Sequence, residues 1–360
     1  DPDEAERLCK CYSGNTKECH DVNLSELREY GNLYYAVIKA DGDYMGSGYW
    51  SGNLNGYSVS SYIITIAEYL KEIGAEEDIV KKLTESASNV EERIRKAKEE
   101  LGLPPGLPLT PAYAYTLTRA LTVQAIVDKI VLEKNYVVPI YLGGDDILAL
   151  SPVKLASHYI PLDAVKETRR AYWRFADNHV ANFDGFKSIG GMVVDSPRIY
   201  GRSYAIFVAH YRDPMTISLS MANYLLELKD KVNGKDAAFV SSGRGVSGFS
   251  YSVIKLSNDS GNLDLSQLDL LEEILEKLGS KQFSNSLVYD LLSLGEYKDK
   301  GESFTLLVLR TIERNTEDKK AAEELKAKVK DIIGKPPCTG EACEGKEALL
   351  NLIEAVNHLR

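Results

Sequence analysis

The chain has 360 residues, of which 44% are hydrophobic and 27% are charged, and its formal net charge is −10 at pH 7. These values are typical of a globular protein with two domains, or one large domain and an appendage, and the charge argues against a surface that binds nucleic acid throughout. No apolar stretch approaches the length of a membrane span and no signal peptide opens the sequence, so we expect a cytoplasmic protein without membrane contact.

The first 30 residues are polar and carry three of the five cysteines. We expect residues 1–30 to be the tail of a preceding cysteine-containing module. Cys9, Cys11, Cys19 and His20 could supply four zinc ligands, but a C-x-C pair is not the usual zinc-knuckle spacing. Zinc and free thiols therefore both stay open here.

The next predicted elements are a strand and two helices. An apolar run over 33–40 predicts a strand that leads directly into Asp41-Gly42-Asp43. Helical periodicity follows over about 57–100, with a break near a glycine at position 74. A second helix is predicted to about residue 134, because a threonine at 110 can cap it and a proline at 111 suits its first position.

Residues 136–150 hold two strand-like apolar runs split by Gly143-Gly144-Asp145-Asp146. The pattern predicts a β-hairpin in which glycine supplies the positive φ of the turn. One interpretation is a tight turn whose aspartates are solvated. The other is a metal site, since two adjacent carboxylates repel each other unless a cation lies beside them.

The remaining elements complete a β-α-β-β-α-β order with insertions, which is the ferredoxin-like arrangement of an α+β fold. They are a helix at about 162–181, strands at 188–194 and 203–210, a helix at 215–232, and strands at 237–241 and 249–256. In this fold the first strand lies beside the hairpin, which brings Asp41 and Asp43 next to Asp145 and Asp146. Because Gly42 lets the chain turn, we expect Asp41 to share a metal ion with the hairpin and Asp43 to matter less.

Residues 31–260 are therefore predicted as one domain and residues 261–360 as a separate all-helical C-terminal domain. Its helices are expected at 265–278, 284–294, 303–315, 319–333 and 346–359. Cys338 and Cys343 flank a loop short enough to close with a disulfide, which would be unusual in a cytosol unless the organism is a hyperthermophile.

Carboxylates at strand ends can hold two Mg²⁺ or Mn²⁺ ions about 3.5–4 Å apart, an arrangement that favours phosphoryl transfer from a nucleoside triphosphate. Gly143 and Gly144 would let the backbone approach the nucleotide closely, and we expect Gly42 and Asp43 to line it as well. Two basic residues are candidates for neutralising the triphosphate, or are ordinary surface residues: Lys187 and Arg202.

Three motifs in this order resemble the large subunit of type III CRISPR effector complexes. They are "KADGDYMG" (Lys39 to Gly46), "YLGGDDILAL" (Tyr141 to Leu150) and "SYAIFVAHYRDPM" (Ser203 to Met215). The similarity runs through much of residues 31–255, and the first motif favours the Cmr (III-B) branch. The hairpin would then belong to a polymerase- or cyclase-like palm domain.

The resemblance implies a subunit of an RNA-guided antiviral complex that binds ATP and divalent metal. In that family ATP is joined into cyclic oligoadenylate when the complex binds target RNA, so the implied partners are other effector subunits, guide RNA and target RNA. The family's functional residues fall on Gly143, Gly144, Asp145, Asp146 and Asp41. The family's nuclease domain and first palm are absent from this sequence, so this chain alone could bind ATP without cyclising it.

Two alternatives stay open. A stand-alone cyclase would make a cyclic dinucleotide from GTP, although Asp146, where such enzymes carry glutamate, and the helical C-terminal region count against it. A structural scaffold with a relic palm would hold neighbouring subunits, although the retained aspartates count against full decay. Incubation with each nucleoside triphosphate, followed by mass analysis of products, separates these alternatives.

Overall fold

The structure of the chain is a computed structural model that describes residues 33–50, 63–64, 67, 70–71, 74–102, 110–155, 158–172, 185–189, 192–196, 201–243, 250–258, 263–334 and 345–359. The candidate zinc ligands and the candidate disulfide lie outside these residues and stay predictions: Cys9, Cys11, Cys19, His20, Cys338 and Cys343.

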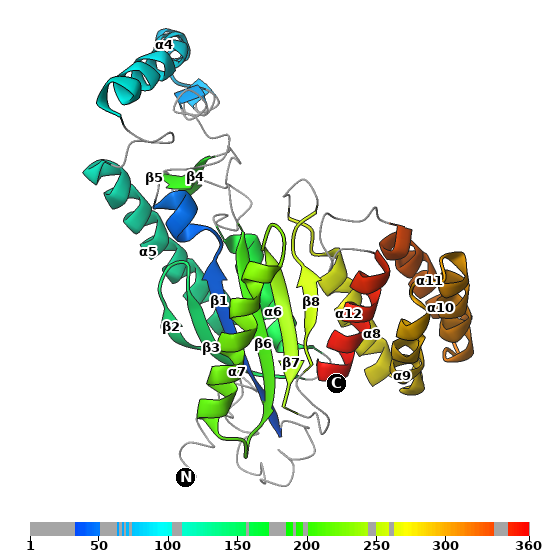
Figure 1. The fold of residues 1–360 in the computed structure, drawn as a ribbon. Helices are drawn as coiled ribbons and strands as arrows, with labels where there is room; N and C mark the ends of the chain where they lie inside the picture. Colours follow the sequence, from blue (N-terminus) through cyan, green and yellow to red (C-terminus); the bar gives the residue numbers. More distant parts are fainter. Residues whose placement is uncertain are drawn as a thin grey trace.

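A six-stranded sheet forms the centre of the fold (Figure 1). In the order in which they lie across the sheet, the strands are β2 (Val138–Leu142), β3 (Ile147–Pro152), β1 (Tyr34–Gly42), β6 (Arg202–His210), β7 (Ala237–Ser242) and β8 (Ser252–Lys255). Neighbouring strands are antiparallel except β6 and β7, which run parallel. The order β2-β3-β1-β6 is ferredoxin-like, so the predicted α+β class and the place of the first strand beside the hairpin are confirmed.

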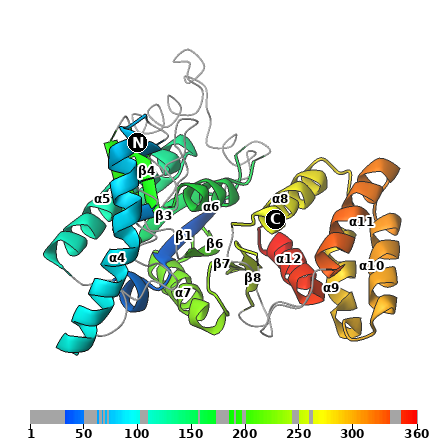
Figure 2. The same cartoon turned by 90° about the horizontal axis from the view of Figure 1, so that it is seen from above.

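Helices cover both faces of the sheet, which is why β6 is buried along nearly its whole length. On one face, α6 (Ile160–Ala171) packs with the end of α5 (Pro111–Lys134). On the other face lies α7 (Met215–Glu227), and Figure 2 shows α6 and α7 on opposite sides of β1 and β6. Side chains of a strand alternate between these two faces, and the alternation separates the two apolar cores.

The sequence signals at the start of α5 act as predicted. The Thr110 hydroxyl accepts a hydrogen bond from the backbone N–H of Tyr113 at 3.1 Å, and Pro111 occupies the first helical position. Gly74 adopts a φ of +78°, which ends the preceding helical segment ahead of α4 (Glu77–Leu101). A glycine tolerates this conformation without the steric cost that a side chain would add.

Two predicted boundaries are wrong. The helix expected to reach residue 181 ends at Ala171, because Tyr172 has an extended backbone and its ring is buried against Arg202. In place of the single strand expected at 188–194, the structure has two paired strands, β4 (Gly185–Ile189) and β5 (Met192–Ser196), which form a hairpin separate from the main sheet. The two residues between them in the sequence are glycines, which a two-residue hairpin connection favours.

The described C-terminal region is helical, and its helices stand beside β8 in Figure 2. They are α8 (Ser266–Gly279), α9 (Ser286–Ser293), α10 (Glu302–Arg314), α11 (Lys319–Gly334) and α12 (Gly345–Leu359). Shorter helical turns occupy Met45–Tyr49, Leu228–Lys231 and Leu294–Tyr297. Leu268 and Val356 share one apolar core with Ile254 of β8, so the core continues from the sheet into these helices. The domain division at residue 260 stays a prediction.

Among the described residues, none of the helices combines the length and the hydropathy that crossing a bilayer requires.

Candidate active site

Three carboxylates meet where β1 ends beside the β2–β3 turn. Ala40 pairs with Ile147 across the sheet, so the next residue of β1, Asp41, lies level with the turn. One carboxylate oxygen from each of Asp41, Asp145 and Asp146 lies within 4.8 Å of the others. All three side chains are half-buried, which leaves the cluster open to a ligand from solvent.

Burial and mutual repulsion both disfavour negative charge in this cluster. The pKa of Asp146 is raised to about 6, chiefly by burial and then by the charges of Asp145 and Asp41. Burial also raises the pKa of Asp145, and the charge of Asp41 adds to that effect. A bound cation would reverse this repulsion, and a group of carboxylate oxygens is the ligand set that Mg²⁺ and Mn²⁺ prefer. These residues therefore fit a hard divalent ion.

Lys229 is a cation that faces this cluster. It lies in the helical turn after α7, is largely buried, and forms an ion pair with Asp41. Its Nζ also lies 3.8 Å from Oδ1 of Asp43 and donates to the carbonyl oxygen of Gly42 at 3.4 Å. Sequence reasoning missed Lys229, because a lysine among other charged residues at a helix end carries no signal that it is buried.

Asp43 lies apart from the three clustered carboxylates. It is fully buried, and its two oxygens accept hydrogen bonds from the hydroxyl of Ser203 and the backbone N–H of Asp236, both at 2.9 Å. A Cβ on Gly42 would stand 2.5 Å from the hydroxyl of Tyr172 and 2.8 Å from Cβ of Asp145. Gly42 therefore allows the end of β1 to pack closely against the hairpin turn, and neither residue needs a nucleotide to explain it.

Asp43→Asn is expected to reduce the dependence of stability on pH. Burial raises the pKa of Asp43 to about 6, although the charge of Lys229 opposes this shift. The folded chain thus binds this proton more tightly than the unfolded chain, so the stabilisation is full below about pH 4 and is lost as the pH rises through about 6. Asparagine carries no charge, and its amide oxygen can accept from the backbone N–H of Asp236 while its amide nitrogen donates to the hydroxyl oxygen of Ser203. About 1–3 kcal/mol of pH-dependent stability should therefore disappear.

Urea unfolding of the metal-free chain at about pH 4.5 and pH 7 measures this effect. The variant should equal or exceed the wild type at the higher pH. A variant that loses as much stability as the wild type between the two pH values would show that Asp43 does not titrate in this range.

The two hairpin glycines have structural roles of their own. The backbone N–H of Gly143 donates to the carbonyl of Asp146 at 2.9 Å, which closes the turn. Gly144 has a φ of +94°, and a Cβ there would stand 2.7 Å from Cβ of Leu121 on α5. Close packing and positive φ account for Gly144, while close approach of a nucleotide to either glycine stays a prediction.

Gly144→Ala is expected to destabilise the fold by about 2–4 kcal/mol, because it adds the steric cost of a left-handed residue to a collision with Leu121. Gly46→Ala is the matched control, since a Cβ at Gly46 would meet nothing within 4 Å. Denaturant titration of both variants tests this expectation. Equal stabilities would mean that the turn can move away from α5 at little cost.

Arg202 lies beneath the turn and is fully buried. Its Nη2 donates to the carbonyl of Gly144 at 2.6 Å, its Nη1 lies 2.9 Å from a carboxylate oxygen of Asp128, and its guanidinium stacks over the Tyr172 ring at 3.9 Å. Gln124 also donates to Asp128, at 3.0 Å. Arg202 therefore holds the turn from inside, so its interpretation as an ordinary surface residue is wrong, while a role in neutralising a triphosphate stays a prediction.

Lys187 lies on β4, and its side chain is outside the described residues.

A ferredoxin-like sheet with carboxylates at the end of β1 and in the adjacent hairpin turn defines a domain of the palm class. Residues 34–239 match the family described as Cas10/Cmr2, second palm domain, and this match covers more than half of the chain. The chain belongs to this family. The resemblance drawn from the three sequence motifs is confirmed.

The chain is also similar to a curated relative, the "CRISPR system CMR subunit Cmr2" of Saccharolobus solfataricus (strain ATCC 35092 / DSM 1617 / JCM 11322 / P2). The two are 31% identical over 201 residues, which cover 51% of this chain and 19% of the relative. The matched segment thus spans about a fifth of that relative's length.

Two solved structures share the fold. One is described as the apo state of Type III-B Cmr-beta, with a TM-score of 0.58 and 22% identity, covering 93% of this chain and 40% of the other. The second is Type III-B Cmr-beta bound to cognate target RNA, with a TM-score of 0.58 and 20% identity, covering 99% and 42%. At this identity the likeness concerns the fold, and it extends over the C-terminal helices as well as the palm.

Proposed function

We propose that this chain is the nucleotidyltransferase palm of a type III-B CRISPR effector complex, and that it binds ATP with Mg²⁺ or Mn²⁺ and joins ATP into cyclic oligoadenylate. The observation that carries this proposal is the convergence of Asp41, Asp145 and Asp146 in a chain of the Cas10/Cmr2 second palm family. Carboxylates that converge at half-buried strand ends are suited to metal-assisted phosphoryl transfer.

In the proposed reaction, Asp41, Asp145 and Asp146 hold the divalent ions. When bound, such ions supply activation of a ribose hydroxyl and neutralisation of the triphosphate and the departing pyrophosphate. Lys229 compensates the charge of Asp41 and keeps that carboxylate oriented. Arg202 fixes the carbonyl of Gly144, so the two hairpin aspartates are held in place before any ligand arrives.

The proposed partners follow from the relatives. The solved structures that share this fold are Cmr assemblies, one of them bound to target RNA. We therefore expect this chain to dock onto other Cmr subunits in the cytoplasm and to meet guide and target RNA through them. A net charge of −10 suits contact with basic, RNA-bound subunits better than direct contact with RNA.

Mn²⁺ affinity in the presence of ATP tests the site directly. Asp41→Asn is expected to weaken Mn²⁺ binding by about tenfold or more, because it removes a carboxylate ligand that a neutral amide replaces poorly. Asp43→Asn should leave the affinity nearly unchanged, because both oxygens of Asp43 are engaged elsewhere. Negligible losses in both variants would contradict the shared-ligand role of Asp41, and a larger loss at Asp43 would reverse the assignment.

Product analysis separates the proposal from its alternatives. Incubation of the assembled complex with ATP or with GTP, in the presence of Mn²⁺, should give cyclic oligoadenylate from ATP, detected by mass spectrometry. A cyclic dinucleotide formed from GTP would instead identify a stand-alone cyclase. Metal and ATP binding without any product in the complete, target-bound complex would identify a scaffold with a relic palm.

A further inference from the structure

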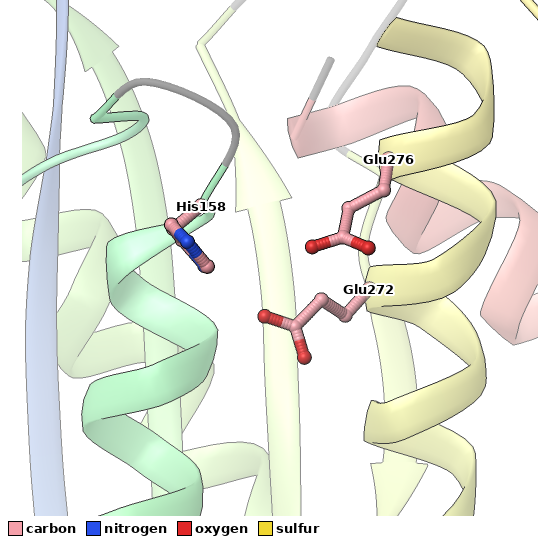
Figure 3. Close-up of side chains that lie close together, drawn as sticks. All are labelled: His158, Glu272 and Glu276. Carbon is pink, nitrogen blue, oxygen red and sulfur yellow. The ribbon is translucent and has the colours of Figure 1, made fainter. Parts of the chain in front are cut away.

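A second group of metal-ligating side chains lies away from the palm carboxylates, between α6 and α8. His158 lies two residues before Ile160, the first residue of α6, while Glu272 and Glu276 lie one turn apart on α8. One ligand atom from each of these three residues lies within 4.8 Å of the others. Figure 3 shows the imidazole and the two carboxylates directed toward one another from the two elements.

The positions of these donors are fixed by regular structure. The backbones of His158 and Leu155 exchange two hydrogen bonds, both at 3.0 Å, so His158 is held at the start of α6. Glutamates four residues apart on one helix share a face, which directs Glu272 and Glu276 to the same side. Lys166, which is buried on α6, forms ion pairs with Glu272 and, at 3.4 Å, with Asp269, and thereby keeps α8 against α6.

Negative charge exceeds positive charge around the three donors. Asp163 adds a third carboxylate, and burial together with the charge of Glu272 raises the pKa of Asp163. Lys166 compensates part of this charge through its ion pair with Glu272, so a metal ion would share that carboxylate with Lys166. His158 and Glu276 are exposed, which gives an ion a path from solvent.

The donor set indicates which kind of ion would bind. Mg²⁺ and Ca²⁺ select oxygen ligands, whereas an imidazole nitrogen suits zinc and its first-row neighbours. One histidine and two carboxylates would leave coordination positions for water, as at zinc sites that are not closed. This chemistry differs from that of the all-carboxylate cluster formed by Asp41, Asp145 and Asp146.

We propose that His158, Glu272 and Glu276 form a second metal site, which binds one divalent cation of the zinc class and ties α8 to α6. Because α8 belongs to the C-terminal helices and α6 to the palm, a metal ion here would fasten the two parts together. The proposal does not depend on nucleotide chemistry, and its failure would leave the proposed function untouched.

Co²⁺ titration tests the site, since its visible absorption reports coordination by nitrogen and oxygen. The parent for the titration carries Asp145→Asn, Asp146→Asn and serine at all five cysteines, which removes the palm site and every thiolate ligand. This parent is expected to bind about one equivalent of Co²⁺. His158→Gln and Glu276→Gln should each weaken binding by at least about tenfold, since even the loss of an outer-shell partner costs that much.

Glu273→Gln is the matched control, because Glu273 lies on the same helix but pairs with Lys277 and Lys328. It should bind Co²⁺ as the parent does. A second readout in the otherwise unmodified chain keeps the test valid if the parent folds poorly. Zn²⁺ should raise the thermal midpoint less in His158→Gln and in Glu276→Gln than in Glu273→Gln. The proposal is overturned if His158→Gln and Glu276→Gln behave like Glu273→Gln in both measurements.

Discussion

Asp145→Ala combined with Asp146→Ala should abolish metal-dependent nucleotide turnover while the chain stays folded. The two aspartates supply two of the three converging carboxylates, and bound metal contributes several kcal/mol of transition-state stabilisation, which corresponds to a rate loss of about a thousandfold or more. Burial raises the pKa of both groups, so their charge is unfavourable in the metal-free fold at neutral pH. Removing both should therefore leave metal-free thermal stability unchanged or higher.

The measurement is oligoadenylate synthesis by the assembled complex, together with thermal unfolding of the chain in chelator. Glu296→Ala combined with Asp299→Ala is the control, since it removes two exposed carboxylates of the C-terminal region. This control should retain synthesis. If the hairpin variant synthesised oligoadenylate at the wild-type rate, the hairpin would not be the active site.

Local patterns in the sequence were sufficient to predict most of the fold. Thr110 and Pro111 marked the start of α5, and the two apolar runs beside Gly143 and Gly144 marked the hairpin. A proline suits only an edge or bulged position of a sheet, and Pro139 lies in β2, an edge strand whose register shifts between Pro139 and Tyr141. These features are set by residues close together in the chain.

The surroundings of the site depend on residues far apart in the chain, and these could not be predicted. Lys229 and Asp41 are separated by 188 positions, and nothing in either segment shows that they pair. Arg202 follows a stretch without a clear hydrophobic periodicity. The sequence therefore could not show that Arg202 is completely buried, since an arginine is usually exposed. His158 was likewise one of five histidines with no sequence relation to Glu272. Such contacts are created by the packing of β6, α7 and α8, which local periodicity does not specify.

Arg202→Met is expected to destabilise the fold by about 3–5 kcal/mol, because it leaves the carboxylate of Asp128 buried without its cation. Burial already raises the pKa of Asp128 to about 6 against the effect of Arg202, so losing Arg202 should raise it further. Methionine fills much of the arginine volume, which limits the contribution of a cavity. The variant also loses the donor to the carbonyl of Gly144, and Mn²⁺ affinity of the folded fraction should fall.

A double-mutant cycle with Asp128→Leu separates charge from packing, measured by urea unfolding at neutral pH. If the unpaired carboxylate causes the loss, the double variant should be more stable than Arg202→Met alone, because no buried charge remains. Arg212→Met is the control, since Arg212 is exposed and its replacement should change stability by no more than about 0.5 kcal/mol. A cycle in which the two single effects simply add would mean that Arg202 stabilises the fold through its contacts with Tyr172 and Gly144 and not through its ion pair with Asp128. Lower Mn²⁺ affinity in the double variant, despite its recovered stability, would show that the bond to Gly144 positions the hairpin aspartates independently of the ion pair.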